Sequence, residues 1–295
     1  MELSMKQKIL SIVLVLVMVG AAYMAMSNRD TDDDGESDDQ AGEETNYLGW
    51  TDLNSYKTML SQRPGRTYSL LPDVDSVSNI DVEDSVLVVV GFDRAPREDE
   101  ISIIEDHIQS GGNVLVVDDG NLSNILTTPH GVIFDGDTLY ETERDQHYLF
   151  NPVYLLETAM VNGIGMTLMF NRATGMEVND SVEVICASSE MRGDLDGPLD
   201  YSYYDRNGNG VVDIEDPAPE TPLIARVTTS AGGQVVFMSD SGPFTDMMWD
   251  QQNNRAFAER LIDSLSGPNG SIFFLDSFQT KDHSNNLEPA GGTFE

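Results

Sequence analysis

Continuous apolar runs alternate with amphipathic segments along most of the chain. Residues 86–90 and 114–117 are entirely apolar, which is typical of strands buried on both faces of a parallel sheet. Between them, residues 98–109 place isoleucines at helical spacing, and two glycines follow where the helix should end. This succession of strand, helix and strand predicts an α/β fold with a doubly wound, mostly parallel sheet.

The remaining pattern predicts the other elements of this fold. Helices are expected at 52–62, with Asp52 as the N-cap, and at 251–265. Strands are expected at 67–71, 223–228, 234–238 and 271–275, and a hairpin-like turn joins the second and third. Residues 131–220 are less regular, with short strands expected at 132–134, 165–170 and 182–187. We interpret them as an irregular β-rich insertion carried by the sheet.

An apolar segment near the N-terminus predicts a membrane anchor. Residues 9–26 are almost uninterruptedly apolar, and as a helix they would span roughly 27 Å, close to the hydrocarbon core of a bilayer. Lys6 and Lys8 precede the segment, which favours a cytoplasmic location for residues 1–8. We therefore expect a single-pass protein of the cell membrane with an extracytoplasmic body. A signal peptide cleaved after Ala22 is the alternative, and it also exports the body.

Polar segments flank the expected folded domain, residues 47–278. Residues 27–46 are strongly acidic and nearly free of apolar side chains, so they cannot bury enough surface to fold and are expected to form a disordered tether. Residues 279–295 are rich in Asn, Gly and Ser and are expected to form a flexible tail.

Charge and cysteine content exclude several classes of function. The chain has 295 residues, with 16 Lys and Arg against 51 Asp and Glu, so its formal net charge is −35. Such a charge argues against nucleic acid as a partner and against docking of the folded part on anionic lipid. It suits either a halophilic setting or an ordinary acidic ectodomain. Cys186 is the single cysteine, which excludes an internal disulfide, a cysteine zinc site and an iron–sulfur centre.

Three segments together resemble the uncharacterised DUF4350 family. They are IEDHIQSGGNVLVVDD (104–119), GGQVVFMSDSGPFTDMMWDQQNNRAFAERLIDSL (232–265) and SIFFLDSF (271–278). The resemblance implies a flavodoxin-type α/β domain similar to the class I glutamine amidotransferases. It also implies a membrane-associated protein of a family whose activity is not established.

The chain departs from the catalytic pattern of amidotransferases. Those enzymes place a cysteine nucleophile at a sharp turn from strand to helix, with a histidine and an acid downstream. Here no cysteine and no Ser–His pair follows the strands at 86–90 and 114–117. Cys186 falls inside a predicted strand, where a buried structural thiol is expected. We therefore expect a binding module rather than an enzyme.

Polar residues follow several predicted strands and form a candidate ligand edge. Open α/β sheets bind ligands beyond the carboxyl ends of their strands, and an acidic edge would suit a cation or an amine. The residues expected there are Asp93, Asp118, Asp119, Ser239 and Asp240. The alternative is that they cap helices and form turns.

A twelve-residue loop, 205–216, has the spacing of a calcium site. Ca²⁺ prefers six to eight oxygen ligands in this alternation, with a glycine at the sixth position. The expected ligands are Asp205, Asn207, Asn209, the carbonyl of Val211, Asp213 and Asp216. The loop resembles those of dockerins and other extracellular EF-hand-like proteins, although it occurs once and lacks strong flanking helices. A polar surface turn is the alternative to a structural Ca²⁺ site.

These features favour a membrane-anchored binding protein with one structural Ca²⁺ and a catalytically silent domain. Its partner would be a protein of an envelope assembly or a small ligand at the sheet edge. One alternative is a metal-assisted hydrolase using Asp118, Asp119 and Asp240, which would have to converge on one point. Another is an auxiliary subunit of a membrane transporter.

Overall fold

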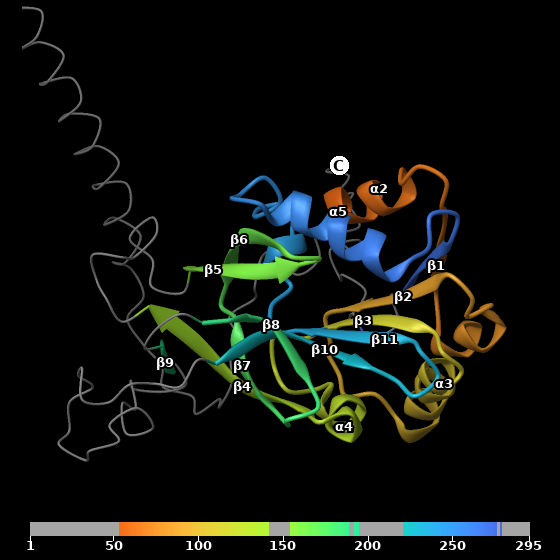
Figure 1. Cartoon of the computed structure of the whole chain (residues 1–295). Helices are drawn as coiled ribbons and strands as arrows, with labels where there is room; N and C mark the ends of the chain where they lie inside the picture. Colours follow the sequence, from red (N-terminus) through yellow and green to blue (C-terminus); the bar gives the residue numbers. More distant parts are fainter. Residues whose placement is uncertain (1–52, 142–153, 189–191, 195–220, 276–277, 279–295) are drawn as a thin grey trace, which may run out of the picture. The chain divides into compact units, whose positions relative to one another are not determined.

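The computed structural model describes residues 53–141, 154–188, 192–194, 221–275 and 278 (Figure 1). Contacts divide the chain into two units, 1–46 and 47–295, and every described residue belongs to the second. The predicted anchor, tether, calcium loop and tail lie outside the described residues. Within the described ranges, no helix is both long and apolar enough to cross a bilayer.

A seven-stranded mixed sheet forms the centre of the domain. Its strand order is β1-β12-β2-β3-β11-β10-β8. The first five strands in this order are mutually parallel, whereas β10 pairs antiparallel with both β11 and β8. The strands are β1 (Thr67–Leu71), β12 (Ser271–Leu275), β2 (Ser85–Val90), β3 (Asn113–Val117), β11 (Gln234–Met238), β10 (Pro222–Thr228) and β8 (Glu183–Ala187). The predicted mixed α/β class with a parallel-containing sheet is confirmed.

Helices cover both faces of this sheet (Figure 1). The α-helices among the described residues are α2 (Asn54–Ser61), α3 (Glu98–Gln109), α4 (Asn124–Thr127) and α5 (Asn254–Leu265). The same part of the chain contains the short 3-10 helices η1 (Val74–Asn79), η2 (Thr128–His130) and η5 (Gly242–Phe244). α2 and α5 lie on one face, and α3, α4 and η1 lie on the other.

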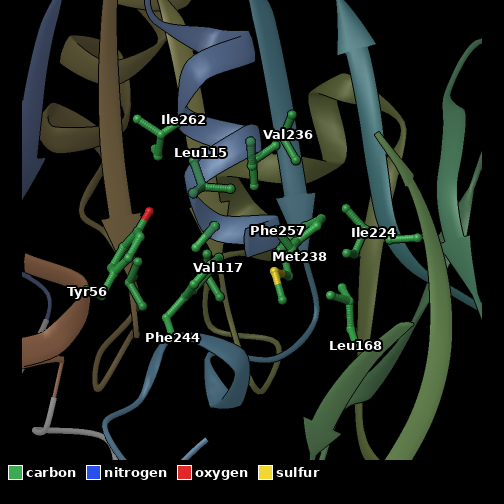
Figure 2. Close-up of a cluster of buried hydrophobic side chains, with 14 of the residues drawn as sticks. Tyr56, Leu115, Val117, Leu168, Ile224, Val236, Met238, Phe244, Phe257 and Ile262 are labelled. Carbon is green, nitrogen blue, oxygen red and sulfur yellow. The ribbon is translucent and has the colours of Figure 1, made fainter. Parts of the chain in front are cut away.

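The alternating side chains of the central strands build two apolar cores. All six residues of β2 are buried, as expected for a strand covered on both faces. One core joins Leu115 and Val236 of the sheet to Tyr56 of α2 and Phe257 of α5 (Figure 2). The other core joins the opposite side chains of the same strands to α3, α4 and η1.

The region predicted as a β-rich insertion forms two small sheets and one strand of the main sheet. β4 (Val132–Glu141) lies between β7 (Thr174–Val178) and β9 (Arg192–Asp194), and β5 (Tyr154–Val161) pairs with β6 (Ile164–Asn171). β4 is longer than predicted because, beyond a register shift between Phe134 and Thr138 in its pairing with β7, its last residues pair with β9. Gly136, at φ 91°, lies within this irregularity. The sequence pattern did not reveal β5, β7 or β9.

Two predicted helix starts are wrong. The N-cap of α2 is Leu53 rather than Asp52, and it makes no side-chain capping bond. Instead, the distant Asp246 accepts the Ser55 backbone N–H at 2.6 Å. α5 begins at Asn254 rather than at residue 251, because the preceding Asn253 donates to the Thr167 carbonyl of β6 from both its backbone and its side chain.

Candidate functional site

The ends of two neighbouring parallel strands bring most of the predicted edge residues together. β3 and β11 run in register, with Val117 opposite Met238. Each strand continues into two polar residues, Asp118-Asp119 and Ser239-Asp240. The Asp118 backbone N–H donates to the Met238 carbonyl at 3.1 Å, so the pairing extends to the start of these segments.

The edge carboxylates divide between the two faces of the sheet. Side chains alternate along a strand, and Val117 and Met238 belong to the core beneath α2 and α5. Asp119 and Asp240 therefore lie on that face, and Asp118 and Ser239 lie on the other. Asp118, Ser239 and Asp240 are almost completely buried, whereas Asp119 is partly exposed.

Asp118 organises the loop that follows β3. One carboxylate oxygen accepts the Gly120 backbone N–H at 3.0 Å, and the other accepts that of Ser123 at 2.7 Å. Burial raises the pKa of Asp118, while these hydrogen bonds act to lower it. This arrangement matches the alternative interpretation of the edge, in which an aspartate after a strand stabilises a turn.

Asp119 and Asp240 form a hydrogen-bonded carboxyl pair. Asp119 also accepts the backbone N–H and the hydroxyl of Ser241, the latter at 2.7 Å. Asp240 accepts the backbone N–H groups of Asn171 and Gly242, the latter at 2.6 Å. The pair thus connects the ends of β3, β11 and β6.

Burial raises the pKa values of both carboxyl groups of this pair. Burial raises the pKa of Asp119 to about 6. The pKa of Asp240 is raised well above its ordinary value by burial and by the negative charge of Asp119. Two neighbouring carboxyl groups cannot both ionise cheaply, so this pair binds protons more tightly than two separate carboxyl groups would.

The other predicted edge residues have different surroundings. Asp93 is exposed, and its backbone N–H donates to the Phe278 carbonyl at 3.0 Å. The hydroxyl of Ser239 is buried and has no hydrogen-bond partner among the described residues. Asp93 is thus tied to the end of the sheet at Phe278.

The described acids do not form a metal cage. Within the described part of the chain, no three His, Cys, Asp or Glu side chains lie close enough together to hold an ion. Asp118 lies on the opposite face from Asp119 and Asp240, so these three carboxylates do not meet at one point. The predicted calcium ligands lie outside the described residues.

Cys186 is a buried side chain of β8, as the strand pattern predicted. Burial, with the nearby charge of Glu157, raises the pKa of its thiol. A thiol held in its neutral form is a poor nucleophile. Of the two described histidines, His107 is buried in α3, and His130 lies 2.7 Å from the Glu105 carboxylate.

A pocket between α2 and α5 was not predicted from the sequence. Its volume is about 300 Å³. Its lining residues are Ser55, Thr58, Met59, Gln62, Arg63, Trp249, Arg255 and Glu259. These side chains come from segments nearly two hundred positions apart, so only the packing of the two helices brings them together.

Solved structures resemble this fold at low sequence identity. The N-terminal domain of mmIFT52 matches with a TM-score of 0.53 and 15% identity, over 74% of this chain and 91% of that chain. Gan42B, a GH42 beta-galactosidase from G. stearothermophilus, matches with a TM-score of 0.33 and 14% identity, over 61% of this chain and 21% of that one. The exo-beta-1,4-mannosidase Op5Man5 from Opitutaceae bacterium strain TAV5 matches with a TM-score of 0.34 and 11% identity, over 61% and 25%.

These likenesses concern the fold alone. The chain spans about a quarter or less of either glycosidase, and no curated protein matches it. Residues 57–262 match the family model described as a domain of unknown function, DUF4350. This match covers more than half of the chain, which therefore belongs to the DUF4350 family.

Proposed function

We propose that this protein is a membrane-anchored extracytoplasmic binding protein whose amidotransferase-like, flavodoxin-type domain is catalytically silent. Its partner would be a protein of an envelope assembly or a membrane transporter, or a small ligand. The apolar segment 9–26 and the acidic segment 27–46 support the anchor and the export of the body. Helices on both faces of a parallel-containing sheet support the amidotransferase-like architecture.

One observation supports the proposal that the domain lacks catalytic activity. At the carboxyl edge, the carboxylate oxygens of Asp118, Asp119 and Asp240 accept hydrogen bonds from nearby backbone N–H groups. Such carboxylates hold loops in place, and they are poorly available to activate a water molecule or a nucleophile. The thiol of Cys186 is likewise buried, within β8.

Turnover assays test directly whether the domain lacks catalytic activity. The full chain, purified in detergent, would be assayed with p-nitrophenyl acetate and p-nitrophenyl phosphate, with and without Mn²⁺. We expect no turnover above that of the Asp119→Asn and Asp240→Asn variants. Turnover that either substitution abolishes, in a variant that still melts cooperatively, would replace the binding role with the hydrolase alternative.

Membrane topology is tested separately. The full chain with a C-terminal tag would be expressed in cells, and its membranes would be extracted at alkaline pH. We expect the protein to stay in the membrane fraction, and its tag to be degraded by protease added to intact spheroplasts. Mass spectrometry of the N-terminus separates the anchor from a signal peptide cleaved after Ala22. A tag protected from external protease would contradict the export of the body.

We also propose that the loop 205–216 binds one structural Ca²⁺. The spacing of oxygen donors along the loop supports this assignment. Ca²⁺ bound only by the native state at a hundredfold excess over Kd would stabilise it by about 2.7 kcal/mol. Thermal melts of the full chain with Ca²⁺ and with chelator test this, and Asp205→Ala should abolish the difference. Equal shifts in the wild type and in Asp205→Ala would place Ca²⁺ elsewhere.

A further inference from the structure

Basic side chains gather on one side of a very acidic protein. The segment from α2 to the start of β1 and the helix α5 together hold five basic residues and two acidic ones, although the whole chain has a net charge of −35. The basic residues are Lys57, Arg63, Arg66, Arg255 and Arg260. The two helices lie next to each other (Figure 1), so these basic residues lie close together, while the Asp246 carboxylate accepts hydrogen bonds from Asn54 and Ser55 at the start of α2.

Ion pairs hold the two helices at one end of the pocket between them. Arg63 pairs with Glu259 at 3.3 Å and with Asp263, and Arg66 pairs with Asp263 at 3.0 Å. The side chain of Arg63 is only 15% exposed, so its charge is compensated and largely covered. These contacts join the two helices, and Glu259 also pairs with Arg255, the second arginine that lines the pocket.

Arg255 is the arginine of the pocket lining whose terminal amino groups can bind a ligand. Its side chain is 61% exposed, and its Nε atom lies 3.2 Å from a Glu259 oxygen. No described residue accepts a hydrogen bond from its two terminal amino groups. It is the second residue of α5, whose first turn carries no acidic side chain, so the helix dipole also favours negative charge there.

The rest of the lining suits the body of a small polar molecule. Ser55 and Thr58 of α2 contribute hydroxyl groups, and Gln62, the C-cap of this helix, contributes an amide. Met59 and Trp249 are largely buried and form an apolar part of the pocket wall. A volume of about 300 Å³ lies at the small end of the range of ligand sites, in which a few polar groups orient the ligand.

We propose that the pocket between α2 and α5 binds a small organic anion, whose carboxylate or phosphate group pairs with Arg255. A planar guanidinium with free terminal amino groups binds either oxyanion through two parallel hydrogen bonds. This proposal rests on the proposed binding function and deepens it, because it gives the domain a ligand class and a place to bind it.

Titration calorimetry tests the proposal. The full chain in detergent would be titrated with citrate and, separately, with inorganic phosphate, at constant ionic strength because of the chain's high charge. We expect saturable binding of at least one of them, and the stronger ligand identifies the source of the oxyanion. Arg255→Gln should weaken that binding at least tenfold. Arg260→Gln changes the charge equally on the exposed side of the same helix and should leave it unchanged.

A second variant tests the pocket itself. Thr58 is exposed at the pocket wall, so Thr58→Phe should fill the pocket and abolish binding without changing charge. The proposal is overturned if neither anion binds saturably, if Arg260→Gln weakens binding as much as Arg255→Gln, or if Thr58→Phe binds normally. Each of these results leaves the anchor and the silent domain standing, since they are tested by topology and by turnover.

Discussion

The carboxyl groups of Asp119 and Asp240 are hydrogen-bonded to each other at the ends of β3 and β11. The pair also accepts backbone N–H groups from Ser241, Gly242 and Asn171, the last at the end of β6. The pair therefore contributes to holding the β5–β6 hairpin against the main sheet, through the hydrogen bond from Asn171 to Asp240.

This relationship predicts that the carboxyl pair stabilises the domain more in mild acid than above neutral pH. The folded-state pKa of Asp119 is about 6 and that of Asp240 is raised well above its ordinary value, whereas both are near 4 in an unfolded chain. The contribution of these two carboxyl groups to stability is complete below their unfolded-state pKa values and is lost as the pH rises through their folded-state pKa values. Since a shift of one pKa unit corresponds to about 1.4 kcal/mol, we expect thermal melts from pH 5 to 8 to show that this pair loses a stabilising contribution on the order of 1–3 kcal/mol.

The variant Asp240→Asn isolates this effect from the general repulsion of a very acidic chain. Asparagine keeps a hydrogen bond to Asp119 but removes the second charge, so the pH dependence should flatten between pH 5 and 8. Asp250→Asn, which removes an exposed acid, is the matched control and should retain the slope of the wild type. Equal slopes in all three proteins would show that the pair does not titrate in this range.

The sequence was informative wherever one local pattern decides the structure. The buried strands β2 and β3 and the helix α3 follow directly from apolar runs and helical spacing, and four of the five predicted edge residues do lie together. The hairpin β5–β6 was partly hidden because β5 exposes Leu156 and Met160 while burying its other face. Its pattern therefore does not alternate between apolar and polar residues.

Contacts between distant segments could not be predicted in this way. Asn254 is buried, and its amide bonds to the backbone of Met169 and Met248, so the start of α5 depends on β6. The Asp119–Asp240 contact and the pocket beside Arg255 arise in the same manner. Their residues are ordinary in sequence, and only the packed structure gives them particular partners.

Tyr56 carries a buried hydroxyl that makes no hydrogen bond with the described residues. Its ring stacks on Phe244 with centroids 4.5 Å apart and lies near Trp249 and Phe274. We expect Tyr56→Phe to keep or raise the free energy of unfolding by up to about 1 kcal/mol, because it removes an unpaired polar group. Tyr56→Ala should lower it by about 3–5 kcal/mol through loss of packing. Chemical denaturation measures both, and a large loss in Tyr56→Phe would reveal a partner for the hydroxyl.

Gly112 leaves the space that the imidazole of His107 occupies. A β-carbon at position 112 would lie 2.2 Å from His107 Nε2, and His107 is itself buried. We expect Gly112→Ala to lower the free energy of unfolding by about 1–3 kcal/mol through overpacking. The loss should shrink when His107→Ala is also present, which a double-mutant cycle measures. Additive losses would mean that the clash lies elsewhere.

His107 should contribute a pH dependence of the opposite sign, because acid removes its contribution to stability. Burial lowers its folded-state pKa, so the unfolded chain binds a proton more readily. The stability that depends on neutral His107 is complete above the unfolded pKa of about 6.5 and is lost as pH falls through the folded value. His107→Gln does not titrate, so between pH 7 and 5 we expect its stability relative to that of the wild type to rise as the pH falls. Parallel melting curves over this range would contradict the assignment.

Glu100 fixes the start of α3 and the loop before it. Its carboxylate accepts two hydrogen bonds of 2.7 Å from Arg94 and one of 2.8 Å from the Arg97 backbone N–H. The hydrogen bonds from Arg94 are the main reason that its pKa is lowered, so its contribution is present above the unfolded pKa and is lost as pH falls. We expect Glu100→Gln to lower the free energy of unfolding by about 1–3 kcal/mol at neutral pH.

The neighbouring Asp99 provides the control for this prediction. The variant Asp99→Asn removes the same charge from the same helical turn. The Asp99 side chain, however, is 70% exposed, and among the described residues it pairs only with Arg97, at 3.3 Å. Asp99→Asn should therefore change the free energy of unfolding by less than about 0.5 kcal/mol, since exposed ion pairs contribute little. The two variants should also differ in salt dependence, because salt screens an exposed pair far more than a buried one. If both variants lost the same stability, charge at the helix start rather than the geometry of the Arg94–Glu100 pair would be the cause.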